Sequence, residues 1–429
     1  MIDLRVPGDK SVSHRAVLLA PLATGVSRIE GLGDGADVAT SLAVMRALGA
    51  RIETARSARA GLDATIEGHV LAEPAGTLDC GNSGTTARLL IGILAGAGIG
   101  ATLDGDASLR ARPMRRVVYP LQAMGLRAHY LGGAGRLPLR LEPRATGTLR
   151  TLRHRARVAS AQVKSAILLA GVTGRVRVSV LEPARSRDHT ERMLRAMGVP
   201  LGTAETESGH EASLDPDAWD GRLTPLDLVI PGDPSSAAFL VGAALLAGRD
   251  VRIEGVSENP TRTAFLDVLA EMGARVERSA GQESGGEPAG DWLVRADAAL
   301  EPFDLGGRRI PSLIDELPLL SVLSARAAGR SVFRDAGELR VKESDRIGLM
   351  AENLSALGVE VEELPEGLAI HGTDRRLEGR VRTGGDHRMA MAFGTLGLDP
   401  RARVEVDDPA CAGVSFPGFW DLLERIRHG

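Results

Sequence analysis

Six short polar clusters contain most of the residues of this chain that could do chemistry. They are residues 8–15, 81–86, 160–162, 232–236, 315–316 and 386–388, and each precedes or opens an expected helix. Serine, asparagine, threonine and aspartate are ordinary helix N-caps. Capping does not require the accompanying Lys10, Arg15, Gln162 or Arg388. Free N–H groups and positive dipole ends at helix starts attract phosphate and carboxylate, so converging helices would make an anion site.

Basic residues at the second helices and the scarcity of lysine support this interpretation. Arg112, Arg187 and the pair Lys342 and Arg346 precede or open later helices. The 52 basic residues include only three lysines, Lys10, Lys164 and Lys342. An ammonium is a compact charge with three donors that a guanidinium cannot replace. Chance retention would also explain three lysines. Exposure to solvent would explain many of the arginines.

The sequence gives little support to a nucleotide-binding loop, a catalytic triad or a metal site. The Gly-Asp-Lys-Ser run lacks the earlier glycine of a P-loop, and Asp386-His387-Arg388 has no partner serine at triad-like spacing. Cys80 and Cys411 are isolated, which indicates reduced thiols without a disulfide framework or a zinc site. We therefore expect no metal.

A sixfold internal repeat must position these clusters. Apolar helical runs, each followed by an alternating strand, recur at nearly equal spacing, starting at Ser13, Thr85, Ser160, Ser235, Asp315 and Asp386. After five of them comes a second helix that ends in Leu-Gly or Met-Gly, and the sixth is followed by a C-terminal helix. We expect six β-α-β-α-β units, an α/β fold with two pseudo-symmetric domains of three units each.

The expected domains are residues 9–227 and residues 1–8 with 228–429, because residues 1–8 form a short strand that returns to the second half. Residues 279–290, rich in Gly, Ser and Glu, are expected to form a surface loop. A chain of 429 residues is too long for one core.

Composition narrows the function further. Aromatic residues make up 3% of the chain and the net charge is −4, so no base-stacking surface or basic field for nucleic acid is expected. The charged start is unlike a signal peptide, and no apolar run is long enough to span a membrane. These features predict a cytoplasmic protein.

Together the motifs resemble the enolpyruvyl transferases, in particular the branch that acts on shikimate 3-phosphate. The motifs are Asp-Lys-Ser-x-Ser-His-Arg, Gly-Asn-x-Gly-Thr, Arg-Pro-Met, Ser-Ala-Gln-Val-Lys-Ser, Arg-Asp-His-Thr-Glu, Ile-Asp-Glu, Val-Lys-Glu-Ser-Asp-Arg and Asp-His-Arg-Met-Ala-Met. The resemblance implies an inside-out α/β barrel fold with the active site in the interdomain cleft. It also implies transfer of the enolpyruvyl group of phosphoenolpyruvate to the 5-hydroxyl of shikimate 3-phosphate, without cofactor, in aromatic amino acid biosynthesis by the shikimate pathway.

The resemblance also assigns residues to each substrate. Those implied for shikimate 3-phosphate are Lys10, Ser11, Arg15, Ser160, Gln162, Arg187, Asp315 and Lys342. Those implied for phosphoenolpyruvate are Lys10, Asn82, Gly84, Arg112, Gln162, Arg346 and Arg388. Asp315 matches the proton acceptor, Glu343 matches the proton donor, and Lys10 and Lys342 complete the catalytic set. His387 is a supporting group, and Lys164 has no role carried over.

Three positions differ among relatives. Val414 stands where some members have a phosphoenolpyruvate-binding lysine, and Ala161 stands where others have a second serine. Some glyphosate-tolerant members have alanine where this chain has Gly84, so we expect a glyphosate target that is sensitive to the inhibitor.

Two alternatives stay open. The sister enzyme that uses UDP-N-acetylglucosamine usually has a reactive cysteine before the Arg-Pro element, and residues 108–112 contain none. A non-catalytic or RNA-phosphate-processing relative would leave Asp315 and Glu343 unexplained. We expect a monomer that binds small molecules only. Its domains should close on substrate, because the site residues divide between the halves.

Overall fold

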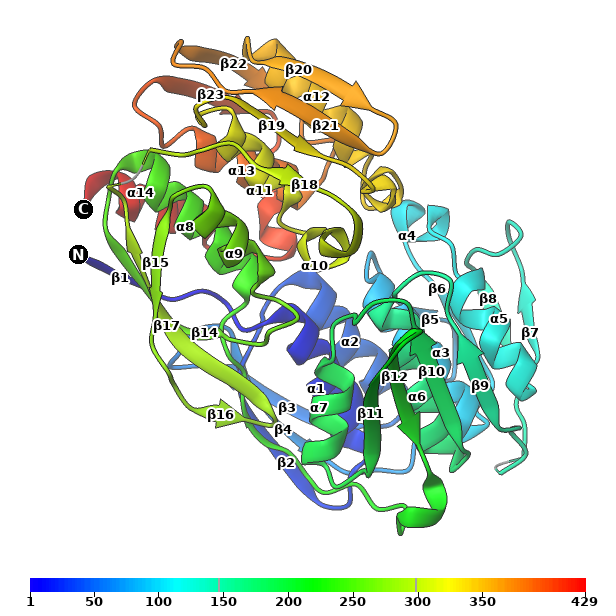
Figure 1. Cartoon of the computed structure of the whole chain (residues 1–429). Helices are drawn as coiled ribbons and strands as arrows, with labels where there is room; N and C mark the ends of the chain where they lie inside the picture. Colours follow the sequence, from blue (N-terminus) through cyan, green and yellow to red (C-terminus); the bar gives the residue numbers. More distant parts are fainter. Residues whose placement is uncertain (146, 298) are drawn as a thin grey trace. The chain divides into compact units, whose positions relative to one another are not determined.

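The structure, a computed structural model, describes residues 1–145, 147–297 and 299–429 (Figure 1). These residues separate into two compact units. Unit A contains Lys10–Ile230 and Ser284–Glu287, and unit B contains Met1–Asp9, Pro231–Glu283 and Pro288–Gly429. Among the described residues, no helix combines the length and apolarity needed to cross a membrane.

The described strands of unit A form three four-stranded sheets. The first has the order β13 (Asp227–Val229), β2 (Val26–Leu32), β4 (Leu62–Glu67) and β3 (Arg51–Arg56). The second has the order β5 (Leu78–Asp79), β6 (Ala101–Asp104), β8 (Leu139–Leu141) and β7 (Ala128–Tyr130). The third has the order β11 (Leu201–Thr206), β12 (Gly209–Leu214), β10 (Val178–Glu182) and β9 (Leu152–Arg155).

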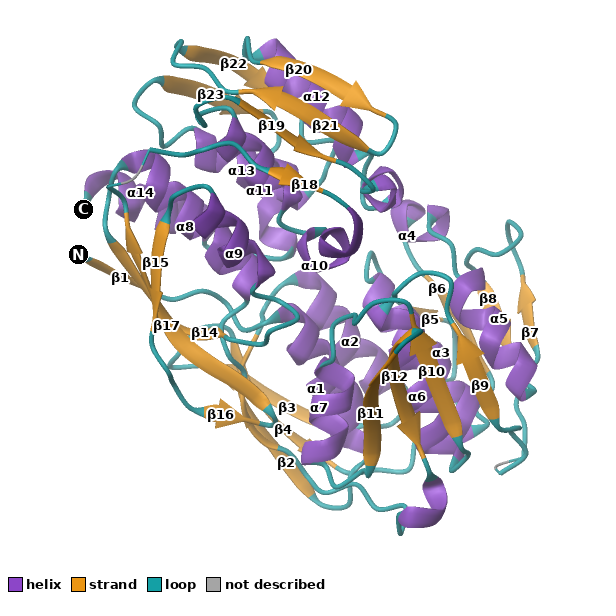
Figure 2. Ribbon diagram, in the orientation of Figure 1, coloured by secondary structure: helices purple, strands orange, loops and turns teal. Residues whose placement is uncertain are grey.

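Helices pack on these sheets to form one aliphatic core (Figure 2). The first helix of each repeat is α1 (Lys10–Leu19), α3 (Gly84–Ala97) or α6 (Ala161–Gly174). The second helices are α2 (Ala36–Ala47), α5 (Arg115–Met124) and α7 (His189–Ala196), with the short α4 (Ala107–Ala111) before α5. α3 packs along α6, and α1 contacts α2, α3 and α7. Nearly every residue of α3 and α6 is buried, so these helices form the centre of the unit.

Unit B repeats the same plan. Its first sheet has the order β1 (Ile2–Leu4), β14 (Val251–Ser257), β17 (Glu287–Arg295) and β15 (Arg275–Arg278). The second has the order β18 (Asp304–Leu305), β19 (Arg330–Phe333), β21 (Gly367–His371) and β20 (Glu360–Leu364). The third pairs β22 (Leu377–Val381) with β23 (Ala402–Val406). Its helices are α8 (Pro234–Ala247), α9 (Ala264–Glu271), α10 (Ile310–Leu313), α11 (Leu317–Ser324), α12 (Arg346–Ala356), α13 (His387–Leu396) and α14 (Phe419–His428). β1 pairs in parallel with β14, so the N-terminal strand belongs to this unit.

The α/β class and the repeated architecture are as predicted, but the repeat contains one more strand. The complete copies read β-α-β-α-β-β, because the last strand is followed by an antiparallel partner, as in the hairpin of β3 with β4. The additional strand of the first copy, β4, has only a short period-two pattern, with Ala64 and Ile66 buried in alternation with more exposed residues. The surface loop predicted for residues 279–290 is also wrong in part, since β16 (Glu283–Ser284) and the start of β17 lie there.

Glycine ends the second helices, as the Leu-Gly and Met-Gly signals predict. A glycine one or two residues after the end of each of five helices has a positive φ; these are Gly49, Gly125, Gly198, Gly273 and Gly358. Only glycine adopts this left-handed conformation without strain, and it satisfies the last helical carbonyl groups. The chain then turns into the strand that follows each helix.

Candidate active site

In unit A, the predicted anion-binding residues lie at the starts of α1, α3 and α6 and on adjacent loops. Direct contacts join these segments. Nε2 of Gln162 on α6 donates a hydrogen bond to the hydroxyl of Thr85 on α3, over 3.1 Å. Lys10, the first residue of α1, forms an ion pair with Asp37 in the first turn of α2. The fold therefore brings together helix starts that are far apart in the sequence.

Arg15 is fixed by three elements. The residue is 3% exposed, and its Nε donates to the Thr190 hydroxyl of α7 over 2.6 Å. Nη2 donates to the Ser165 hydroxyl of α6 over 3.1 Å, and Nη1 to the carbonyl oxygen of Ser11 over 2.8 Å. A positive charge in this fixed orientation suits recognition of a phosphate.

His14 lies next to Arg15 in a different environment. Its side chain is fully buried, and Nδ1 shares a 2.8 Å hydrogen bond with the Ser41 hydroxyl. Burial lowers the pKa of His14 to about 3. The imidazole is therefore neutral at pH 7 and supports the packing of α1 against α2.

The candidate phosphoenolpyruvate cradle begins before α3. Nδ2 of Asn82 donates to Asp106 over 2.8 Å, and its Oδ1 accepts a hydrogen bond from Nη2 of Arg112. A Cβ at Gly84 would lie 3.5 Å from Nη1 of Arg112 and 2.7 Å from Nη1 of Arg88. Gly84 therefore lies directly against two guanidinium groups.

Sequence reasoning missed Arg88. This side chain is 4% exposed; its Nη1 donates to Oε1 of Gln162 over 2.7 Å and its Nη2 to the carbonyl oxygen of Pro113 over 3.2 Å. A lone charge within the apolar run 87–94 was the available signal, because a buried arginine requires polar partners. Arg88 orients Gln162 toward α3.

Ser160 occupies the N-cap position of α6, yet its side chain makes no capping hydrogen bond. Its backbone N–H instead donates to Oε1 of Glu182 over 2.6 Å. The described residues offer the Ser160 hydroxyl no hydrogen-bond partner, so this group can bind a ligand. Arg187 is half-buried in the loop that leads into α7.

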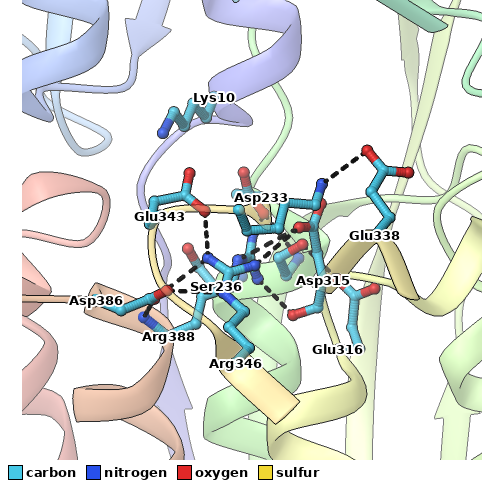
Figure 3. Close-up of polar contacts among 12 residues, drawn as sticks. Lys10, Asp233, Ser236, Asp315, Glu316, Glu338, Glu343, Arg346, Asp386 and Arg388 are labelled. Carbon is cyan, nitrogen blue, oxygen red and sulfur yellow. Dashed lines mark hydrogen bonds and ion pairs between the residues drawn. The ribbon is translucent and has the colours of Figure 1, made fainter. Parts of the chain in front are cut away.

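In unit B, Arg346 is the centre of the candidate site (Figure 3). It is 1% exposed, and its Nε and Nη2 donate to the two oxygens of Asp386 over 2.8 and 3.2 Å. Nη2 also donates to Glu343 over 2.8 Å, whereas Nη1 has no hydrogen bond among the described residues. Because Asp386 and Glu343 accept from Nε and Nη2 of the guanidinium, Nη1 is the buried nitrogen that remains to bind an anionic ligand.

Asp386 and Arg346 stabilise each other's charge. Burial alone would raise the pKa of Asp386, but the Arg346 guanidinium holds that pKa below its ordinary value. Burial alone would lower the pKa of Arg346, and the carboxylates of Asp386 and Glu343 raise it instead. Asp386 also caps α13 by accepting from the Arg388 N–H over 2.9 Å. One carboxylate therefore positions both predicted arginines.

Asp315 lies in the turn between α10 and α11, close to the same two arginines. Its Oδ1 is 3.6 Å from Nη1 of Arg346 and 3.6 Å from Nε of Arg388. Nη1 of Arg388 donates to the Asp315 carbonyl oxygen over 2.8 Å. The Asp315 carboxylate therefore lies beside two guanidinium groups.

The remaining predicted residues surround this group. Lys342 forms a 3.7 Å ion pair with Glu338, one helical turn earlier, and Glu343 is partly exposed. His387 is buried at the start of α13. Val414 ends a short 3-10 helix, Pro409–Val414, and its apolar side chain is partly buried. The described residues contain no cluster of His, Cys, Asp or Glu that could hold a metal ion.

Comparison with known proteins gives this arrangement its context. The family described as EPSP synthase (3-phosphoshikimate 1-carboxyvinyltransferase) matches residues 2–423. The chain belongs to the EPSP synthase family. The resemblance identified from the motifs and the enzyme class that it implied are thereby confirmed.

Individual EPSP synthase relatives match this sequence over nearly its whole length. A 3-phosphoshikimate 1-carboxyvinyltransferase of Synechococcus sp. (strain RCC307) is 45% identical, with 99% of this chain and 96% of the relative covered. One of Salinibacter ruber is 46% identical, with 98% and 96% covered. The solved EPSP synthase of Acinetobacter baumannii matches with a TM-score of 0.84 at 37% identity, covering 99% of this chain and 95% of that one. The enolpyruvyl transferase NikO of Streptomyces tendae, at 18% identity and a TM-score of 0.77, shares the fold.

Proposed function

We propose that this protein transfers the enolpyruvyl group of phosphoenolpyruvate to the 5-hydroxyl of shikimate 3-phosphate and releases phosphate. The observation that carries the proposal is the family match over residues 2–423, and the arrangement around Arg346 supports it. Both substrates are polyanions, and the chain as a whole has a net charge of −4. Local guanidinium and ammonium groups are therefore needed to offset the repulsion between the substrates.

The unit A residues are proposed to bind shikimate 3-phosphate. Arg15 supplies a fixed positive charge, and the uncapped Ser160 hydroxyl supplies a donor. The other proposed contacts are Lys10, Ser11, Gln162 and Arg187. Several donors of fixed orientation hold the phosphate of shikimate 3-phosphate in one position. This places the ring hydroxyl of the substrate for reaction.

Phosphoenolpyruvate is proposed to contact both sets of residues. Arg112, Arg346 and Arg388 present planar forks that match phosphate and carboxylate oxygens better than an ammonium does. Asn82 and Gly84 shape the cradle beside Arg112, and Lys10 and Gln162 complete the set. The Nη1 atom of Arg346 supports this role, because it is buried and has no hydrogen bond from the described residues.

The chemistry is proposed to be addition followed by elimination. Asp315 accepts the proton of the substrate hydroxyl, while Glu343 donates a proton to the methylene carbon of phosphoenolpyruvate. The hydroxyl oxygen then bonds to the adjacent carbon, and loss of a proton and phosphate restores the double bond. Lys342 helps to stabilise the developing charge, and His387 supports Asp386 at the start of α13.

The deciding assay measures phosphate release from phosphoenolpyruvate in the presence of shikimate 3-phosphate or of UDP-N-acetylglucosamine. Release that depends on shikimate 3-phosphate is expected, and release only with the sugar nucleotide would refute the proposal. Glu343→Gln and Asp315→Asn should each lower kcat by roughly 10² or more. The control Asp374→Asn alters a carboxylate that is 97% exposed and should leave kcat unchanged.

We further propose that the enzyme acts as a monomer in the cytoplasm on small molecules only. Light scattering coupled to gel filtration should give one chain of 45.1 kDa. Substrate-dependent closure follows from the division of the proposed contacts between the units. Small-angle scattering that stays the same on addition of shikimate 3-phosphate and inhibitor would contradict closure.

A further inference from the structure

Lys164 is the most deeply buried cation outside the residues proposed to touch substrate, and family resemblance gives it no role. Its side chain is 0% exposed. Nζ lies 3.0 Å from Oε2 of Glu182 and 2.8 Å from Oε1 of Glu191, and both carboxylates are themselves buried. Nζ also donates to the carbonyl oxygen of Ser186 over 3.4 Å. The ammonium therefore forms ion pairs with one carboxylate at the end of β10 and one on α7, and donates a hydrogen bond to the loop between them.

Each partner of Lys164 is linked to a proposed shikimate 3-phosphate contact. Oε1 of Glu182 accepts from the backbone N–H of Ser160 over 2.6 Å, at the start of α6. Oε2 of Glu182 accepts from the Ser186 hydroxyl over 2.7 Å, immediately before Arg187. Glu182 thus joins the N-cap of α6 to the loop that carries Arg187.

The second carboxylate and Lys164 itself are each next in sequence to a residue that accepts a hydrogen bond from Arg15. Glu191 is adjacent to Thr190 on α7, and the Thr190 hydroxyl accepts from Nε of Arg15 over 2.6 Å. Ser165, the neighbour of Lys164 on α6, accepts from Nη2 of the same arginine over 3.1 Å. One ammonium therefore connects α6, the 186–187 loop and α7.

We propose that Lys164 is a positioning residue for the shikimate 3-phosphate half of the site, acting through Glu182 and Glu191 on Ser160, Arg187 and Arg15. The inference rests on the proposed function. A carboxylate at Glu182 needs a counter-charge in this dry location, because an unpaired buried charge is very unfavourable. Burial alone would lower the pKa of Lys164, but Glu191 and Glu182 raise it, so the ammonium stays charged.

The identity of the residue supports the same role. Lysine is rare in this chain, which uses arginine at nearly all its basic positions. A guanidinium has five donors and a planar fork, whereas the surroundings of Nζ described above offer two carboxylates and one carbonyl oxygen. Lys164→Arg would keep the charge but push Glu182 away from Ser160, because a packed interior tolerates added volume poorly.

The test is calorimetric titration of each variant with shikimate 3-phosphate alone, together with KM for both substrates. Lys164→Met, Lys164→Arg and Glu182→Gln should each raise the Kd for shikimate 3-phosphate by on the order of tenfold, since misplacement of a binding group by about 1 Å costs up to 10²-fold. KM for shikimate 3-phosphate should rise in parallel, with a smaller change in KM for phosphoenolpyruvate. The double variant Lys164→Met with Glu182→Gln should bind shikimate 3-phosphate no more weakly than the weaker-binding single variant does, because both substitutions break the same chain of contacts.

A buried ion pair elsewhere provides the matched control. Arg326 and Asp399 in unit B are 3% and 4% exposed and are bonded to each other. Arg326→Met should reduce thermal stability, as Lys164→Met does, yet leave both KM values unchanged. A Kd within about twofold of wild type in any folded variant of Lys164 or Glu182 would overturn the proposal. Failure of the wild-type protein to bind shikimate 3-phosphate would instead overturn the proposed function, independently of Lys164.

Discussion

The substitution Gly84→Ala tests the cradle before α3 directly. The added Cβ would lie 2.7 Å from Nη1 of Arg88, whereas favourable contacts between non-bonded heavy atoms begin near 3.5 Å. Arg88 is buried, so its guanidinium can relieve the contact only by leaving Oε1 of Gln162. The backbone of Gly84 has no positive φ, which means that the effect is one of space and not of backbone strain.

The size of the effect follows from that contact. Overpacking of this kind costs about 1–3 kcal/mol. Because Arg88 and Arg112 both lie against position 84, we expect the cost to appear when phosphoenolpyruvate binds. A loss of about 1–3 kcal/mol corresponds to a rise of roughly 5- to 150-fold in KM for phosphoenolpyruvate, with a smaller change for shikimate 3-phosphate.

Steady-state kinetics with each substrate varied in turn provides the measurement. Gly76→Ala is the matched control, because a Cβ at Gly76 would have nothing within 4 Å and its φ is not positive. Circular dichroism and the midpoint of thermal unfolding would establish that both variants are folded. A folded Gly84→Ala variant with the wild-type KM for phosphoenolpyruvate would show that the contact with Arg88 does not matter for the cradle.

Three further predictions concern the inhibitor, Arg346 and His14. Glyphosate should inhibit the wild-type enzyme in competition with phosphoenolpyruvate, and undiminished turnover at inhibitor concentrations far above KM would contradict the expectation from Gly84. Arg346→Lys should raise KM for phosphoenolpyruvate by about tenfold or more, because an ammonium cannot bond both oxygens of Asp386 and retain a free donor. The pKa of His14 is about 3 in the folded protein and near 6.5 when unfolded, so stability should fall as the pH drops below about 6.5. Between pH 7 and pH 5 this loss is about 2 kcal/mol, and urea unfolding of His14→Asn should lack that component.

Local signals in the sequence were enough to predict the helices and their ends. The apolar runs, their polar starts and the terminal Leu-Gly and Met-Gly pairs each depend on a few neighbouring residues. The candidate residues Arg346 and Arg388 were found in the same way, from motifs at helix starts. The hairpin strand β4 was not predicted, because its buried residues, Ala64 and Ile66, give only a short alternation.

Contacts between distant residues could not be predicted. The bond between Arg88 and Gln162 joins positions 74 residues apart, and that between Arg346 and Asp386 joins positions 40 residues apart. Such pairs depend on how helices pack, which no local pattern encodes. Lys164 illustrates the same limit: the sequence shows a lysine in an apolar helix, whereas its role depends on Glu182 and Glu191 in other elements.

The pairing of β1 with β14 also affects the order in which the chain can fold during synthesis. Arg5 and Glu254, which bond beside this pair of strands, are separated by 249 positions. At about 5–20 residues per second, the ribosome needs roughly 12–50 s to make that stretch. The whole of 10–230 emerges during this time, so most of unit A can form before the first strand of the protein finds its partner. Unit A is in this sense an inserted domain, and unit B is completed last.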